Sequence, residues 1–554
     1  MSAVRKWVIF LQTKSGSMKR VKKDYEKTGF LTLLLVMAVY YGYRLFALTP
    51  WYDELYTYYF FISRGPVYAA IHWPVPNNHV GYSVLSAILD YFGNPYIGLR
   101  GVSYLCALTN LVLLFRIGRA YLARGLSLFV VILYVSMNLV NQLAVQGRGY
   151  TLGITCYLTA FCCLIVICRE EQCRKRYFIL FSLSLVLALY TLTSDVYFVL
   201  PVCLTGGIYL LYLGILERKE RECRLKECKP FRKLLFLILA SLAAAVMTII
   251  LYSIIWIAIG SNLLVKDEAS GFYGMGHVRM ILSAPFKALK TGMEYMLATP
   301  YIQSVAREGF LKRLFDWFGV LFNWYYDGMG IAVSVLVIIC LIVLLLTLIR
   351  SMKRKEKGSQ LLSLFLLTGM LCMPLFLMIQ CALPYYRVFV YGGVLLALAV
   401  GFLVQKVLEF PKEIRSKSVK VTWSTGVIAS SLLISTALSV FCFTSKGYQN
   451  QYSMREYYIQ DALTHGNITQ AENLCVTDCT QQYLMKFLYD ITCENTVIEG
   501  SDYVLFDKKM LAPEYNEMEW EFYHYYNTIP WDYVNDNLKQ VYENESFVLF
   551  IKNT

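Results

Sequence analysis

Eleven long apolar runs are the feature that most constrains how this 554-residue chain can fold. Each is long enough to cross a hydrocarbon core of about 30 Å. Because the runs are continuous rather than alternating, they exclude a transmembrane β-barrel, and 44 Tyr and 32 Phe exclude a disordered chain. The sequence therefore predicts an all-α polytopic membrane protein, with spans near 29–48, 100–118, 125–142, 150–168, 176–193, 196–214, 234–259, 329–349, 360–381, 387–407 and 421–443.

The distribution of basic residues predicts how the spans are oriented. Every second connection between spans is rich in Lys and Arg, and these connections together with residues 1–28 hold 33 of the 52 basic residues. By the positive-inside rule, the N-terminus lies in the cytoplasm and the C-terminus outside a cell membrane. The formal charge of +14 combines about −10 on the outer tail with about +24 on the rest. It therefore reports orientation, and we expect no nucleic-acid partner.

Composition divides the chain into three parts. A basic cytoplasmic tail (1–28) precedes the membrane domain (29–443), whose long outer loops are 49–99 and 260–328, and an acidic outer domain (444–554) follows. The pattern of the last part predicts a small α/β domain with a helix at 480–491 and strands at 473–477, 496–498, 503–506 and 546–551. Two of its three cysteines (Cys475, Cys479 and Cys493) could form one disulfide, and the spacing does not choose the pair.

Two adjacent carboxylates, Asp53 and Glu54, directly follow the first span. Acids are costly to place this close to hydrocarbon. The apolar residues after them recur at helical spacing, which predicts a short amphipathic helix at the interface. Neighbouring side chains on a helix point about 100° apart, so one carboxylate can face a cavity while the other binds a cation or caps the helix. The alternative is a helix cap at a membrane boundary.

The same outer loop continues with Asn77-Asn78-His79. Asn77 or Asn78 can cap an amphipathic segment at 80–92. His79, at the start of that segment, could be a hydrogen-bond donor, a general base or a metal ligand. The alternative is an ordinary polar residue in a loop.

Three more ionisable residues stand at the outer ends of spans. Arg148 lies between two glycines that allow a close approach of the backbone, which suits a lipid phosphate, although snorkelling to the interface would also explain it. Arg387 follows two tyrosines in the fifth outer turn. Asp195 is a further outer acid whose alternative role is a cap of the next helix. Together with Asp53, Glu54 and His79, these residues supply the acids and cations needed for a transfer reaction at the lipid–water boundary.

These motifs resemble the GT-C superfamily of membrane glycosyltransferases, and specifically the protein O-mannosyltransferase-like family, glycosyltransferase family 39. The resemblance covers 29–215 well, 329–443 loosely and the tail hardly at all. It is carried by Trp51-Tyr52-Asp53-Glu54, Asn77-Asn78-His79, Gln146-Gly147-Arg148-Gly149-Tyr150 and Pro384-Tyr385-Tyr386-Arg387.

The resemblance implies a hexosyl- or pentosyltransferase that takes a sugar from a polyprenyl-phosphate donor and inverts the anomeric centre. It implies that Asp53 is the base and that Glu54 is a supporting acid or cation ligand. By the same resemblance Arg148, Tyr150 and Arg387 hold the donor phosphate. Asn78, His79 and Asp195 position substrate, and Glu54 and His79 are the candidate ligands of a divalent cation. The acceptor, whether glycan, lipid or protein, is left open.

Two departures from the family pattern bear on the acceptor and on the metal. Val80-Gly81 replaces prolines that often follow the Asn-His element, and Asp195 lies where relatives tend to carry a His-Tyr pair.

Two other classes of function are weighed beside the enzyme. A transporter or flippase for a lipid-linked or amphipathic solute predicts charges in mid-span and symmetry between halves, and the sequence shows few acids at span centres and no inverted repeat. A membrane-anchored binding protein would leave the first-loop acids unexplained.

Overall fold

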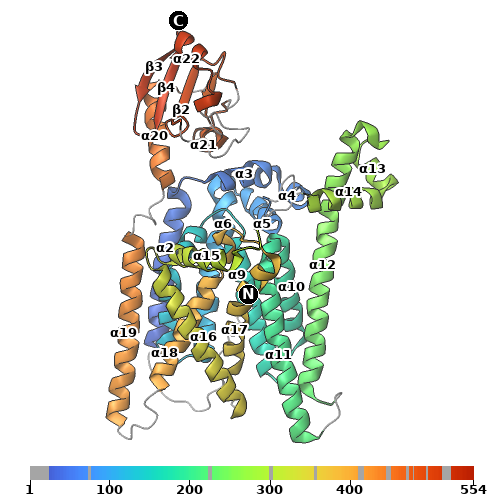
Figure 1. The fold of residues 1–554 in the computed structure, drawn as a ribbon, viewed down its shortest axis with the longest axis vertical. Coiled ribbons are helices and arrows are strands. Elements are labelled where there is room, and N and C mark those ends of the chain that lie inside the picture. The colour runs from blue at the N-terminus through green and yellow to red at the C-terminus, as the bar shows by residue number, and fades with distance from the viewer. Residues whose placement is uncertain are drawn as a thin grey trace.

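The computed structural model describes residues 24–72, 77–171, 173–222, 227–298, 304–354, 359–409, 417–444, 451–468, 473–477, 479–493, 497–513 and 526–553. Of the predicted cytoplasmic tail 1–28, all but the last five residues lie outside this part. A bundle of long helices forms the body of the molecule, and a small domain of helices and strands stands at one end of it (Figure 1).

Nine helices in the described part of the chain are long and apolar enough to cross a membrane. Many Leu, Ile and Val side chains on the outer surfaces of several of them are exposed, as expected for surfaces that face lipid. This confirms an all-α polytopic membrane protein. The helices are α2 (Tyr25–Ala47), α6 (Pro95–Tyr121), α9 (Tyr150–Arg169), α11 (Val196–Arg221), α12 (Lys229–Lys266), α16 (Gly330–Lys353), α17 (Gln360–Gln380), α18 (Gly392–Glu409) and α19 (Lys417–Thr444).

Two predicted spans take a different form. The run at 125–142 is divided into α7 (Leu126–Val135) and α8 (Asn138–Ala144), which meet at 74°. The side-chain amide of Asn141 donates to the carbonyl oxygens of Val135 and Met137 at 2.5 and 3.0 Å, so it satisfies carbonyls at the bend. The run at 176–193 forms α10 (Lys175–Thr191), a helix of 17 residues and thus about 25 Å long.

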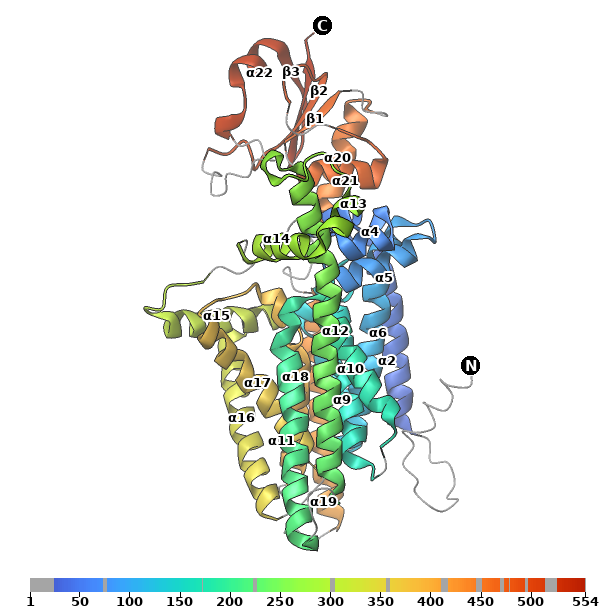
Figure 2. The same ribbon diagram turned by 90° about the vertical axis from the view of Figure 1, so that its right-hand side faces the viewer.

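The outer loops fold into short helices that cover one end of the bundle (Figures 1 and 2). The predicted amphipathic helix of the first loop is present as α3. Helix α12, with 38 residues, continues past the bundle to carry α13 and α14 of the second long loop. These outer elements are α3 (Tyr52–Phe60), η1 (Ile62–Arg64), α4 (Pro66–Ile71), α5 (Val80–Asp90), η3 (Glu268–Ser270), α13 (His277–Ser283), α14 (Pro285–Ala298) and α15 (Phe310–Tyr325).

The C-terminal part forms a small α/β domain, as predicted. Its four strands are ordered β1-β2-β4-β3, with β1 parallel to β2 and the other pairs antiparallel. The elements are α20 (Gln451–His465), β1 (Leu474–Val476), α21 (Cys479–Tyr489), β2 (Tyr503–Asp507), η5 (Tyr526–Thr528), α22 (Trp531–Asn537), β3 (Leu538–Glu543) and β4 (Phe547–Lys552).

Two details of the tail differ from the prediction. Of the strand predicted at 496–498, residue 496 lies outside the described part, and Val497 and Ile498 are not in a strand. Strand β3, which has mostly exposed side chains, was not predicted because it lacks an apolar alternation. Cys475 and Cys493 are buried, the side chain of Cys479 lies outside the described part, and the disulfide stays a prediction.

Helix α9 lies at the centre of the bundle. It is the most deeply buried of the long helices, with 78% of its apolar window enclosed by the rest of the protein. The turn that precedes it, Gln146–Gly149, is therefore held at the middle of one end of the bundle, directly beside α3. This position brings the first-loop acids together with Arg148.

Candidate active site

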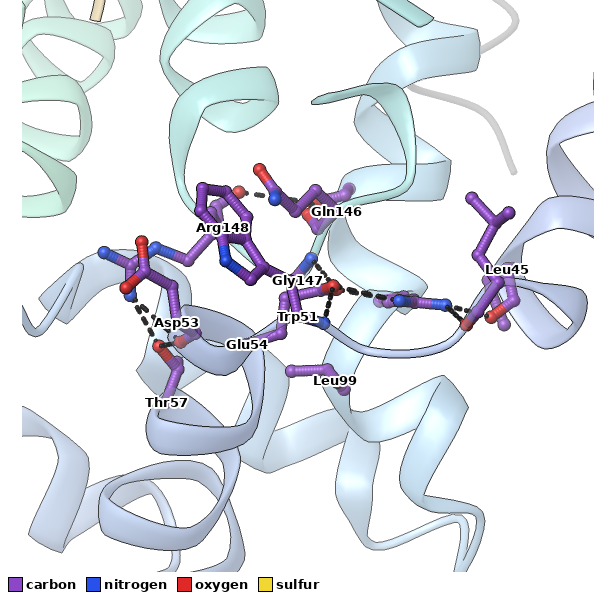
Figure 3. Close-up of polar contacts among 12 residues, drawn as sticks. Leu45, Trp51, Asp53, Glu54, Thr57, Leu99, Gln146, Gly147 and Arg148 are labelled. Atoms are coloured by element: carbon purple, nitrogen blue, oxygen red, sulfur yellow. Dashed lines mark hydrogen bonds and ion pairs between the residues drawn. The ribbon is translucent and has the colours of Figure 1, made fainter. Parts of the chain in front are cut away.

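Asp53 and Glu54, adjacent in sequence, have different surroundings. Both lie in the first turn of α3, where negative charge is favoured at the N-terminus of a helix. Figure 3 shows Glu54 between Trp51 and Gly147, while Asp53 lies on the side of Arg148 and Thr57.

Glu54 is buried and its two carboxylate oxygens each accept two hydrogen bonds. Oε1 accepts from the Gly147 N–H at 2.6 Å and from Arg100 Nε at 2.8 Å. Oε2 accepts from the Trp51 N–H at 3.0 Å and from Arg100 Nη2 at 2.9 Å. All of its acceptor sites are occupied, so Glu54 caps and anchors α3, which differs from the expected cation ligand.

Arg100, which the sequence reasoning did not select, completes this anchor. Its Nη1 donates to the carbonyl oxygens of Leu45 and Leu48 at 3.0 and 2.6 Å, at the C-terminal end of α2. The guanidinium group therefore joins the end of α2 to the start of α3. The signal that could have found it is an arginine at the outer end of a predicted span, the same signal that singled out Arg148.

The carboxylate of Asp53 faces the guanidinium group of Arg387 near the surface of the site. Its Oδ2 lies 3.1 Å from Arg387 Nη2, and the side chains of Asp53 and Arg387 are 16% and 19% exposed. Asp53 Oδ2 is itself a buried polar atom without a hydrogen bond of good geometry in the described residues, so its contact with Arg387 is an ion pair. Of the predicted site residues, this pair is the one that solvent reaches.

Arg387, in η4 (Tyr386–Phe389), is held by aromatic neighbours. Its Nε donates to the Tyr150 hydroxyl at 2.9 Å, and its guanidinium carbon lies 5.1 Å from the centre of the Trp51 ring and 4.7 Å from that of Tyr385. Cation–π contacts of this kind fix the plane of a guanidinium group. The late turn of the bundle and the first outer loop thus meet, as the predicted site requires.

Arg148 is 1% exposed and its donors are turned inward. Nη1 donates to Thr57 Oγ1 at 2.6 Å and to the carbonyl oxygens of Asp53 and Asn77 at 3.3 and 3.1 Å, and Nη2 donates to Asn77 Oδ1 at 2.6 Å. The expected direct contact with a lipid phosphate is therefore not supported by this arrangement. Arg148 instead joins α3 to the loop before α5, and none of its hydrogen-bond partners is a carboxylate.

His79 is buried against the same arginine. The Gly149 N–H donates to its Nδ1 at 2.8 Å, and Arg148 Nη2 lies 3.0 Å from its Nε2. Burial, followed by the charges of Arg148 and Arg387, holds the pKa of the imidazole well below its ordinary value of 6.5, so the ring is neutral. Because Nδ1 accepts a hydrogen bond, the proton of the neutral ring is on Nε2, and His79 therefore offers no open nitrogen to a metal ion.

Asn78 and Asp195 do not touch the Asp53–Arg387 pair. Asn78 donates to the carbonyl oxygens of Ala69 and His72 at 3.0 and 2.8 Å and accepts from Ser83 Oγ at 2.7 Å, so it holds the loop together rather than facing substrate. Residue His79, and not an asparagine, is the N-cap position of α5.

Asp195 ends η2 (Thr193–Asp195) and is buried, and its Oδ2 has no hydrogen-bond partner in the described residues. A Cβ added to Gly153 would lie 2.6 Å from this oxygen, whereas one added to Gly149 would meet His79. Gly149 is the N-cap residue of α9, and Gly153 lies one turn further along the helix. Asp195 therefore lies about 5 Å deeper along α9 than the His79 ring.

Glu54 and His79 do not form a cation site, because their acceptor atoms are already used. Among the residues that the structure describes, no group of three or more His, Cys, Asp and Glu side chains could hold a metal ion.

Comparison with known proteins gives a structural match and no sequence match. No protein-family model and no curated protein matches the chain. The structure of ArnT from Cupriavidus metallidurans bound to undecaprenyl phosphate aligns over 96% of this chain and 98% of its own, with a TM-score of 0.52 and 11% identity. The apo state of the same protein aligns over 95% and 98%, with a TM-score of 0.46 and 9% identity.

The chain has the GT-C fold. ArnT is a glycosyltransferase of that fold, and the alignment with its lipid-bound structure includes nearly the whole of both chains. The fold that the sequence predicted is thereby confirmed. The narrower resemblance to family 39 is not supported by the match to ArnT, which belongs to family 83.

Proposed function

We propose that this protein is a membrane glycosyltransferase that moves a sugar from a polyprenyl-phosphate donor to a hydroxyl acceptor on the outer face, with inversion. The observation that carries the proposal is the ion pair between Asp53 and Arg387, which is partly open to solvent at the outer end of a GT-C fold. The undecaprenyl phosphate bound to ArnT supports a lipid phosphate as the leaving group.

The charges of the site favour an anion. Asp53 and Glu54 stand against the guanidinium groups of Arg100, Arg148 and Arg387, so these five side chains carry a net charge of +1 when ionised. Arg148 is a buried cation with neutral hydrogen-bond partners, and such a charge is costly without compensation. A phosphate near Arg387 would supply the missing negative charge.

The ion pair also suggests how the base is released. When the donor phosphate binds Arg387, the guanidinium group exchanges Asp53 for phosphate oxygens, and the carboxylate becomes free to accept a proton. The acceptor hydroxyl loses its proton to Asp53 while its oxygen attacks the anomeric carbon. The bond between that carbon and the phosphate oxygen breaks, its electron pair stays on the phosphate, and attack from the opposite face inverts the centre.

The remaining predicted residues support this pair. Tyr150 orients Arg387, while Arg148 and His79 hold α3 against the start of α9. Asp195, one turn deeper, is the predicted residue left to position substrate. We infer a hexosyl or pentosyl group and an acceptor glycan, lipid or protein outside the cell membrane.

Substitution of the proposed base tests the function. Asp53→Asn keeps the size of the side chain and should lower transfer by about 10²–10⁴-fold, the usual contribution of a general base. Asp316→Asn, which changes an exposed acid on α15, is the matched control and should transfer at the wild-type rate.

The assay supplies membranes with lipid-linked sugar and follows outer-surface glycoconjugates by mass spectrometry. Thermal unfolding of both variants shows whether folding is intact. If a folded Asp53→Asn protein transfers sugar at the wild-type rate, Asp53 is not the base.

A further inference from the structure

Helix α3 has two faces with different partners. The face with Asp53 and Thr57 contacts Arg148 and Arg387. Its other side is rich in aromatic residues, and the C-terminal domain lies over it (Figure 1). A helix of nine residues is not stable alone in water, so its position depends on what packs against both sides.

Tyr483 of α21 makes the first part of the contact with α3. Its ring centre lies 6.3 Å from that of Tyr52, 5.7 Å from that of Tyr59 and 6.1 Å from that of Phe60. The ring of Tyr59 is stacked on it and that of Phe60 meets it edge to face, which are the arrangements that aromatic pairs prefer. One side chain of the tail thus touches α3 at both of its ends.

Phe487 and Lys486 extend the contact by one turn. The Phe487 ring lies edge to face with Tyr58 of α3 at 5.4 Å and with Tyr96 of α6 at 5.0 Å. The ammonium group of Lys486 lies 5.1 Å from the centre of the Tyr59 ring. The contact therefore joins the tail to α3 and also to the bundle beneath it.

Leu55 shows that the contact is part of a folded core. It is fully buried, and it belongs to the hydrophobic core of the C-terminal domain together with Leu484 and Met485 of α21. Leu55 directly follows Glu54, the residue that anchors α3. A shift of the domain would therefore move the helix that carries the proposed base in its first turn.

We propose that the C-terminal domain positions the catalytic helix, with Tyr483 and Phe487 as positioning residues that hold Asp53 against Arg387. We call these two side chains and their contacts on α3 the aromatic latch. The inference rests on the proposed function for the role of Asp53. Small displacements of a catalytic group lower rates steeply, so loss of the latch should lower transfer by about 10²-fold without a change in the chemical groups present.

The latch is tested in the full-length protein with Tyr483→Ala combined with Phe487→Ala. Hydrogen exchange of the α3 amides, which needs no substrate, should become at least about tenfold faster, and transfer should fall. Tyr483→Phe combined with Phe487→Tyr keeps the rings and should restore both. Val541→Ala, at an exposed apolar residue of β3, is the matched control and should change neither.

A second variant approaches the latch from the other side. Tyr59→Ala removes the stacking partner of Tyr483 and leaves the tail sequence intact, so exchange in β2 and β4 should stay slow while exchange in α3 rises. If α3 exchange and transfer are both unchanged in Tyr59→Ala and in the alanine pair, the latch is overturned. Activity of Asp53→Asn in the same assay would overturn the proposed function instead, and the exchange result would still decide whether the tail holds α3.

Discussion

At the scale of single residues, the site is organised by which arginine each acid meets. Glu54 meets Arg100 in a buried, bidentate pair with 2% and 3% of the two side chains exposed, whereas Asp53 meets Arg387 nearer the surface. This buried pair is structural, since Glu54 has no spare acceptor site for a ligand and four of the five N–H donors of Arg100 are used. The chemistry is thereby left to Asp53.

Removal of Arg100 should show that the Glu54 pair is structural. Arg100→Met leaves a buried carboxylate without its cation and should lower the free energy of unfolding by about 3–5 kcal/mol. Thermal unfolding in detergent measures the loss. The matched control is Lys290→Met, which breaks an exposed pair with Glu294 on α14 and should leave the midpoint unchanged. Equal midpoints for the two variants would contradict this role of Arg100.

At the scale of elements, helix α14 of the second long loop and the span α12 depend on close approach of their backbones. A Cβ added to Gly260 of α12 would lie 1.8 Å from the Ala288 carbonyl oxygen, and one added to Gly292 of α14 would lie 1.9 Å from that of Trp256. Contacts this short exclude any side chain. The two glycines therefore allow α14 to cross the outer end of α12.

A single methyl group should separate these two helices. Gly292→Ala would force α14 away from α12, so amide exchange and proteolysis within 285–298 should rise. Gly319→Ala in α15 adds the same methyl group where nothing lies within 4 Å, and it should not raise either. Unchanged protection of α14 in Gly292→Ala would mean that the helices have room to adjust.

At the scale of the whole molecule, the proposed chemistry is confined to one end of the bundle. The first-loop helices, the turn before α9, η4 and the C-terminal domain all lie there (Figures 1 and 2). Helix α12, about 57 Å long, extends well past a hydrocarbon core of about 30 Å toward the same side. A donor held by its lipid tail could therefore present its phosphate at this end.

The basic connections predict that this end is outside the cell. An epitope tag at the C-terminus should bind antibody on intact cells, because the positive-inside rule places the tail outside. A tag at the N-terminus serves as the matched control and should bind only after permeabilisation. If the antibody does not bind the C-terminal tag on intact cells, the predicted orientation is wrong.

Properties that depend on residues close together in the sequence could be predicted from the sequence alone. The spans, the short helix after Asp53 and the α/β character of the tail follow from the length and period of apolar runs, which are local. The bend at Ser136 and Met137 could not be read this way, because hydropathy does not report how Asn141 satisfies carbonyls at a break. Strand β3 was not predicted for a similar reason, since most of its side chains are exposed and it has little apolar surface of its own.

The sequence by itself determined that this is a polytopic membrane protein with ionisable residues at the outer ends of its predicted spans, since hydrocarbon tolerates few charges and their positions are visible in the chain. Only the tertiary structure decided the partners. Glu54 and Arg100 are 46 residues apart, and Asp53 meets Arg387 from the far end of the membrane domain. Helix packing determines which of the two adjacent acids pairs with a buried arginine, and a single sequence does not show how the helices pack.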